Sequence, residues 1–159
     1  MTRGDVSWSM KQELFVDWSP DSRDHAALLR SMISDNTARG GPSGHRNVAI
    51  IARNADTGEV SSGVWGSILY GWLFIELLYV AEVDRRQGFG SRLLISAENA
   101  AREQGCLGVW LSSYAFQAPE FYKRNGYEAF GELESCSSKN VADSRLYLFR
   151  KFLRTNGSN

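Results

Sequence analysis

The amino-acid sequence predicts a mixed α/β domain in which helices flank a central, mostly antiparallel β-sheet of about six to seven strands. Seven short runs rich in β-branched and aromatic residues are interspersed with three runs of helical periodicity. The longest helical run directly follows the most apolar β-run, as in an α/β unit. No repeat, low-complexity segment or linker interrupts the 159 residues, so we expect a single domain over residues 1–159.

The N-terminal elements follow from capping and turn residues. Residues 13–18 alternate between polar and apolar side chains and are predicted to form a first strand. Ser19 offers an N-cap hydroxyl and Pro20 suits the first helical position, so a helix is expected to begin there. Three glycines and a proline between residues 36 and 44 predict an irregular loop after this helix.

Three strands are expected next. They are predicted at residues 48–53, 60–69 and 72–80. The first two are joined by a polar turn in which Gly58 can adopt a positive φ, which indicates a hairpin. The third is apolar on both faces except for Glu76, a pattern typical of a strand buried in the middle of a sheet.

The second half of the chain is expected to contain two helices and three strands. Apolar residues recur with helical spacing from Gly88 to Gln104, and Gly105 supplies a C-terminal stop. The remaining elements are predicted as a strand at residues 109–113, a short helix at 119–125, and strands at 128–133 and 145–153.

Composition excludes several classes of function. The 18 basic and 18 acidic residues cancel, so the chain has no net positive field to attract nucleic acid. Two cysteines without a CxxC pair and two histidines without ligand spacing predict neither a disulfide framework nor a metal site. The polar first twelve residues, and the lack of an apolar run of roughly 20 residues, argue against secretion and membrane spanning. A cytoplasmic location is therefore expected.

The segment Arg85–Gly90, with the sequence RRQGFG, separates the most apolar strand from the long helix. Backbone N–H groups at a helix N-terminus can bind an anion, glycines permit its close approach, and arginines add charged donors. The alternative is a tight turn that binds nothing. A P-loop is excluded because no Gly-Lys-Ser/Thr follows, and a dinucleotide fingerprint is excluded because Leu93 stands where a third glycine is required.

The same segment has the R-x-x-G-x-G spacing that is the signature of GNAT acyltransferases. About thirty residues later, Phe121–Tyr127 reads FYKRNGY and is similar to the F-Y-x-x-x-G-F/Y element that these enzymes carry on their last helix. The two motifs occur in the family's order, and the chain resembles the GNAT superfamily most clearly from residue 60 to residue 131. The resemblance implies a GNAT-like fold and acetyl-CoA (coenzyme A) as cosubstrate, with no metal.

The resemblance also implies roles for particular residues. Tyr122 is expected to be the general acid that protonates the CoA sulfur, the alternative being an ordinary half-buried aromatic residue. The asparagine often found six residues before the Phe of F-Y is Ala115 here, and Gln117 is the candidate to replace its contact with the cofactor. The residues expected to bind the cofactor are Leu78, Tyr79, Val80, Arg85, Arg86, Gln87, Gly88, Phe89, Gly90, Ser91 and Gln117.

Amide formation from a thioester needs a neutral amine, and an alkylamine is mostly protonated at pH 7. Glu76 is the lone acid in an otherwise apolar strand and is the first candidate for the general base. Its alternative is a structural carboxylate held by an arginine or by backbone donors. Glu82, just past the strand, is the second candidate, with a solvated loop charge as its alternative.

The function expected from the resemblance is N-acetyl transfer from acetyl-CoA to a primary amine, by direct attack in a ternary complex. A small-molecule acceptor is favoured, because the balanced charge shows no extended acidic groove for a basic peptide. A peptide or protein amine, and an acyl-CoA-binding module without catalysis, are the alternatives. Many relatives form dimers, so a homodimer is a further expectation. Trp65, Tyr70 and Trp72 either wall the acceptor pocket or pack in the core.

Overall fold

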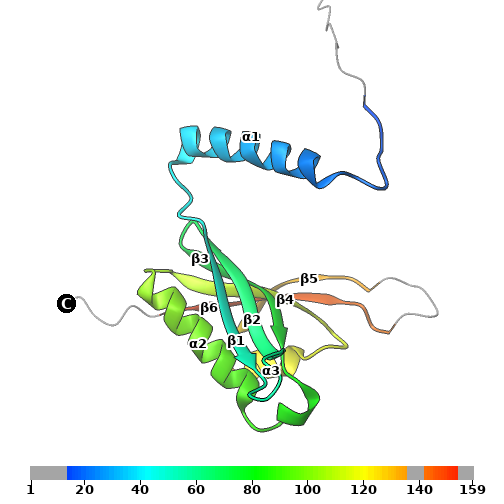
Figure 1. Cartoon of the computed structure of the whole chain (residues 1–159), viewed down its shortest axis with the longest axis vertical. Helices are drawn as coiled ribbons and strands as arrows, with labels where there is room; N and C mark the ends of the chain where they lie inside the picture. The colour runs from blue at the N-terminus through cyan, green and yellow to red at the C-terminus, as the bar shows by residue number, and fades with distance from the viewer. Residues whose placement is uncertain (1–13, 136–141, 154–159) are drawn as a thin grey trace, which may run out of the picture. The chain divides into compact units, whose positions relative to one another are not determined.

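The computed structural model describes residues 14–135 and 142–153 (Figure 1). The chain divides between Pro42 and Ser43 into two compact units. The first contains helix α1 (Ser22–Gly40), and the second contains the β-sheet and every candidate functional residue. Whether these units act as the single domain expected from the sequence stays a prediction.

Helix α1 is shifted relative to its predicted bounds. Asp21, and not Ser19, is the N-cap, because its carboxylate accepts a hydrogen bond from the Arg23 backbone N–H at 2.7 Å. The helix continues to Gly40, so the loop predicted from residue 36 is wrong up to that point. One glycine near a helix end costs only about 1 kcal/mol, and the helix stops where Gly41 adopts a positive φ of 78°.

The predicted first strand is wrong for residues 14–18, which form neither helix nor strand. A strand is stable only when another strand satisfies its backbone N–H and C=O groups, and none of the six strands in the described ranges pairs with this segment. Glu13, where the prediction began, lies outside the described residues.

The six strands form one mixed sheet in the order β1-β2-β3-β4-β6-β5. All neighbours are antiparallel except β3 and β4, which run parallel, so the predicted fold class is confirmed. The strands are β1 (Arg46–Arg53), β2 (Val60–Leu69), β3 (Trp72–Tyr79), β4 (Gly108–Tyr114), β5 (Glu128–Leu133) and β6 (Leu146–Phe152). The second unit also contains the helices α2 (Phe89–Glu103) and α3 (Pro119–Arg124) and the 3-10 turn η1 (Glu82–Asp84).

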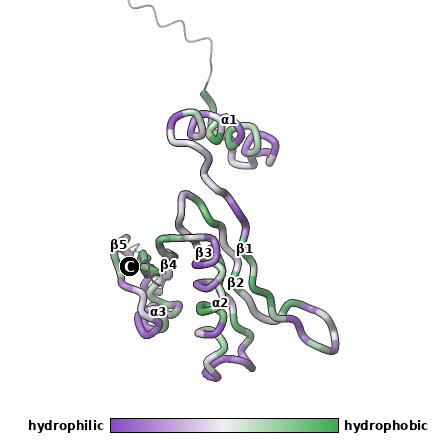
Figure 2. The backbone as a smooth tube through the Cα atoms, turned by 90° about the vertical axis from the view of Figure 1, so that its left-hand side faces the viewer, coloured by the Kyte–Doolittle hydropathy of each residue, from purple (hydrophilic) through white to green (hydrophobic). Residues whose placement is uncertain are grey.

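The core lies where α2 packs on one face of the sheet (Figure 1). Hydrophobic and hydrophilic residues alternate along α2 (Figure 2), so that one stripe of the helix can be buried. Leu94 and Ala97 from this stripe are fully buried together with Leu73, Leu111 and Phe149 from the sheet. Cys106 is also buried, and Cys136 lies outside the described residues.

A buried ion pair fastens α2 to β6. Glu98 is only 3% exposed, and its carboxylate accepts hydrogen bonds from the Lys151 Nζ at 2.8 and 2.9 Å. Lys151 also donates to the Asn125 carbonyl at 2.9 Å, and the Tyr127 hydroxyl donates to Glu98 at 3.3 Å. Burial and the nearby Glu98 carboxylate raise the pKa of Tyr127 above its usual range, so this hydroxyl stays a donor. These contacts hold α2, β6 and the turn after α3 in one fixed arrangement.

Candidate functional site

Strands β3 and β4 separate partway along their length. Their parallel pairing ends at Ile75 opposite Leu111, although β3 continues to Tyr79 and β4 to Tyr114. β2 still pairs with β3 as far as Tyr79, and β6 pairs with β4 over all of its length. Within the described sheet, the edge of residues 76–79 that faces β4 therefore has no ladder partner. The gap is a slot in which an extended ligand can hydrogen-bond to a strand edge.

A β-bulge lies at the start of this slot. On β2, Trp65 is opposite Leu77 and Gly66 is opposite Ile75, so Glu76 is the extra residue on β3. A Cβ at Gly66 would overlap the Phe74 carbonyl, so only glycine fits the close approach of the two strands there.

The expected burial of Glu76 is not observed, because this residue lies on the face of β3 opposite the buried Ile75. Ile75 is buried toward the core, and the extra residue shifts the next core-packed position to Leu78. Glu76 is exposed, so the prediction that β3 is buried on both faces is wrong from this residue onward. Ser112, which follows Leu111 where β4 leaves β3, is likewise exposed. The role of Glu76 as a base stays a prediction, but its carboxylate lies where the strands part and is open to solvent.

The turn before α2 presents unpaired backbone donors. Gly88 is the N-cap of α2 with a left-handed φ of 76°, and Arg86 also has a positive φ of 61°. The Arg92 N–H donates to the Gly88 carbonyl, which leaves the earlier N–H groups of the first turn without helical acceptors. The turn has no side-chain cap and no acidic residue. Its N-terminal partial positive charge is therefore available to an anion.

The slot and the turn open into one cavity of about 450 Å³. Nine of the eleven residues expected to bind the cofactor line it, and they come from the end of β3 and the start of α2. They are Leu78, Tyr79, Val80, Arg85, Arg86, Gly88, Phe89, Gly90 and Ser91.

The position of Arg85 is fixed by two contacts on the β3 side of the cavity. Its Nε donates to the Val80 carbonyl at 3.0 Å, and its guanidinium lies 6.0 Å from the centre of the Tyr79 ring. The opposite wall is tight, because a Cβ at Gly90 would lie 3.1 Å from Cζ of Phe121. The backbone of α2 therefore comes close to α3 across the cavity.

The other two predicted cofactor residues do not line the cavity and instead hold loops. The Gln87 side chain donates to the Val83 carbonyl at 2.8 Å, which braces the turn after η1. The Gln117 side-chain oxygen accepts from the Tyr114 N–H at 2.9 Å, which braces the connection from β4 to α3. Three lining residues, Ala118, Phe121 and Arg124, were missed by sequence reasoning. Their spacing of three residues was the available signal, because it places them on one helical face.

Tyr122 follows Phe121 on α3 and is 9% exposed. Its ring packs edge-on against Phe121 and Tyr127 and lies 5.7 Å from that of Phe149. Burial raises the pKa of its hydroxyl, so the proton needed by a general acid is retained at neutral pH. Tyr122 is not among the residues that line the cavity, and its catalytic role stays a prediction.

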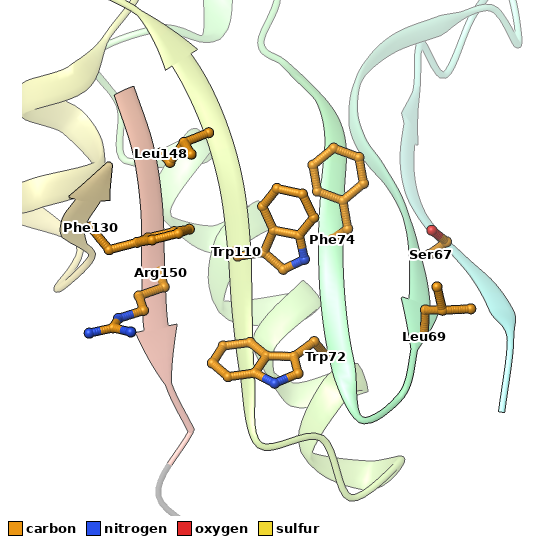
Figure 3. Close-up of a pocket in the computed structure, with 8 residues that line it drawn as sticks. All are labelled: Ser67, Leu69, Trp72, Phe74, Trp110, Phe130, Leu148 and Arg150. Atoms are coloured by element: carbon orange, nitrogen blue, oxygen red, sulfur yellow. The ribbon is translucent and has the colours of Figure 1, made fainter. Parts of the chain in front are cut away.

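A second cavity, of about 580 Å³, is floored by aromatic side chains (Figure 3). Phe74 of β3 and Trp110 of β4 are opposite each other, and their stacked rings have centroids 4.1 Å apart. The next pair, Ile75 and Leu111, is the last before the strands part. Trp72 also lines this cavity, whereas Trp65 and Tyr70 are 43% and 49% exposed and belong to neither cavity nor core.

Glu82 is exposed at the start of η1, and its role as the second candidate base is a prediction still. No group of three or more potential metal ligands occurs in the described ranges. No helix among the described residues is long and apolar enough to cross a membrane.

Comparison with known proteins agrees with the two sequence motifs. A family model described as an acetyltransferase (GNAT) domain matches residues 45–129. An acetyltransferase of Agrobacterium fabrum is 36% identical over 118 residues, which cover 74% of this chain and 85% of the relative. The blasticidin-S acetyltransferase of Streptomyces morookaense is 44% identical over 73 residues, which cover 45% of this chain and 54% of the relative.

Solved structures share the fold. A crystal structure from Agrobacterium tumefaciens, assigned as an acetyltransferase, superimposes with a TM-score of 0.82 at 30% identity, covering 89% of this chain and 100% of that chain. A Bacillus anthracis protein solved in complex with acetyl coenzyme A has a TM-score of 0.56 at 19% identity. The match covers 72% of this chain and 65% of that chain. The predicted GNAT-like fold and the family resemblance are confirmed by these matches, and acetyl-CoA as the cosubstrate stays a prediction.

Proposed function

This chain belongs to the GNAT family of acetyltransferases, and on that premise we propose that it transfers the acetyl group of acetyl-CoA to an amine of a small molecule. The observation that carries this function is the cavity that joins the slot beside β3 to the unpaired N-terminus of α2. An extended amide-containing arm suits the slot, and a diphosphate suits the helix N-terminus. CoA contains both groups, because its amide-containing pantetheine arm is joined at one end to a diphosphate.

Direct attack by the amine is the mechanism that the side chains support. A covalent acetyl-enzyme would need an activated nucleophile, but Cys106 is buried and burial raises the pKa of its thiol. In direct attack the amine nitrogen forms a bond to the thioester carbon, the C–S bond breaks, and the thiolate takes a proton. An N–H of the unpaired β3 edge is suited to stabilise the carbonyl oxygen as it gains charge.

Two side chains are candidates for moving the protons. Glu76 is exposed where β3 and β4 part, so it can take the ammonium proton directly or through water and release it to solvent. Tyr122 keeps its proton because burial raises the pKa of its hydroxyl, as donation to the leaving thiolate requires. Each role predicts a large loss of turnover with little loss of cofactor affinity when the residue is replaced.

The acceptor is proposed from the chain's relatives. The blasticidin-S acetyltransferase matches 73 residues of this chain at 44% identity, which favours an amine on a polar antibiotic or similar natural product. Blasticidin S is therefore the first acceptor to test, beside aliphatic diamines and short peptides. The peptides test the alternative of a protein or peptide amine.

The test combines calorimetry of acetyl-CoA with an assay of thiol release over the acceptor panel. We expect micromolar binding and acceptor-dependent release of free CoA. In Glu76→Gln and Tyr122→Phe, turnover should fall by about 100-fold or more while acetyl-CoA binding stays near that of the unmodified protein. Binding without release for any acceptor would indicate a CoA-binding module without catalysis. No binding by the folded protein would refute the proposed function.

A further inference from the structure

One wall of the acetyl-CoA cavity is formed by α3, and it carries a cation that the family motifs did not indicate. Phe121 and Arg124 are three residues apart on this helix, so they share the face that lines the cavity. Phe121 is the residue that closely approaches Gly90 in the first turn of α2. Arg124 therefore lines, from the α3 side, the same cavity that the first turn of α2 and Arg85 line.

Arg124 has no ion-pair partner among the described residues, and no carboxylate lines the cavity. Its neighbour Lys123 differs in both respects, since its Nζ pairs with Glu120 at 2.7 Å and it does not line the cavity. One hydrogen-bond donor of the Arg85 guanidinium is already used, because its Nε donates to the Val80 carbonyl. The guanidinium of Arg124 is thus an uncompensated cation beside a site that already favours anions.

CoA has two phosphate groups at this end, a diphosphate and a ribose 3′-phosphate. The N-terminus of α2 offers only the donors of one helical turn, which suit one of these groups. A guanidinium matches the geometry of a phosphate with two parallel hydrogen bonds. We propose that Arg124 binds a phosphate group of acetyl-CoA and sets the affinity of the site for the phosphorylated end of the cofactor, an inference that depends on the proposed function.

The experiment measures binding of CoA and of dephospho-CoA, which lacks the 3′-phosphate, by calorimetry in low salt. The protein is compared with Arg124→Gln and with Lys123→Gln as the matched control, since both replacements remove one exposed positive charge from α3. Circular dichroism confirms that each variant is folded. We expect Arg124→Gln to weaken CoA binding by about tenfold and Lys123→Gln to change it less than about twofold.

The two ligands identify which phosphate is bound. A loss confined to CoA assigns Arg124 to the 3′-phosphate, and an equal loss for both ligands assigns it to the diphosphate. Equal binding by Arg124→Gln and Lys123→Gln would overturn the inference while leaving the acetyltransferase function intact. Failure of the unmodified protein to bind CoA would instead refute the proposed function, and the role of Arg124 with it.

Discussion

Replacing Gly88 with alanine separates the structural role of this glycine from its role in cofactor binding. Gly88 adopts a φ of 76° as the N-cap of α2, and a Cβ there would meet no heavy atom within 4 Å. The substitution therefore causes backbone strain without a clash, at a cost of about 1–2 kcal/mol. For a chain of this size, each kcal/mol lowers Tm by roughly 2–4 °C, so we expect a decrease of roughly 2–8 °C.

Gly105 provides the matched control at the other end of α2. It has a φ of 70°, it too would meet nothing within 4 Å, and it does not line the cavity. Gly105→Ala should therefore lower Tm by a similar amount, as measured by circular dichroism. The two variants should differ in affinity for acetyl-CoA, because only the methyl group at Gly88 stands beside the N–H groups at the start of α2.

Calorimetry decides between the two roles. We expect acetyl-CoA to bind at least about tenfold more weakly to Gly88→Ala, and unchanged to Gly105→Ala. Equal affinities would refute the assignment of this turn to the cofactor. If neither variant lost stability, the argument from left-handed backbone strain would be wrong.

Two further predictions concern stability. Lys151→Met leaves the buried Glu98 carboxylate with Arg102 at 3.4 Å as its remaining cation, so the free energy of unfolding in urea should fall by about 3 kcal/mol, the low end for breaking a buried pair. Lys123→Met removes an exposed pair and should cost less than about 1 kcal/mol, and equal losses would contradict the ion-pair argument. Because burial raises the pKa of Tyr122 and Tyr127, the folded state holds these protons more tightly than the unfolded chain does. Stability should therefore fall as pH rises above about 10, and urea unfolding should show no such fall if these hydroxyls titrate normally.

Local signals accounted for most of the sheet and for the cofactor turn. The bounds of β2 and β5 agree with the sequence prediction, because turn residues and alternation are read within a few neighbouring positions. Gly88 and Gly90 likewise indicate a turn from the local sequence alone. Glycine is favoured at Gly88 by its positive φ and at Gly90 by the close approach of Phe121. The residues that form this turn could therefore be predicted without knowledge of the tertiary contacts.

Features that depend on contacts between distant segments could not be predicted in this way. Glu98 and Lys151 are 53 positions apart, and nothing near either residue indicates that they pair. Arg124 belongs to the cavity only because α3 packs beside the first turn of α2. Residues 14–18 alternate between polar and apolar side chains as a strand does, but they pair with none of the described strands. They therefore form no strand despite their local propensity.

The bulge in β3 shows how one residue changes the chemistry expected of this site. The apolar residues on both sides of Glu76 in the sequence make it look like a lone buried carboxylate, which would be costly to keep charged. Glu76 follows the buried Ile75 and lies on the opposite face of β3, and the extra residue moves the next core-packed position from Leu77 to Leu78. The strand therefore presents Glu76 to solvent where β3 and β4 part, while the β3 edge beyond it stays unpaired along the slot.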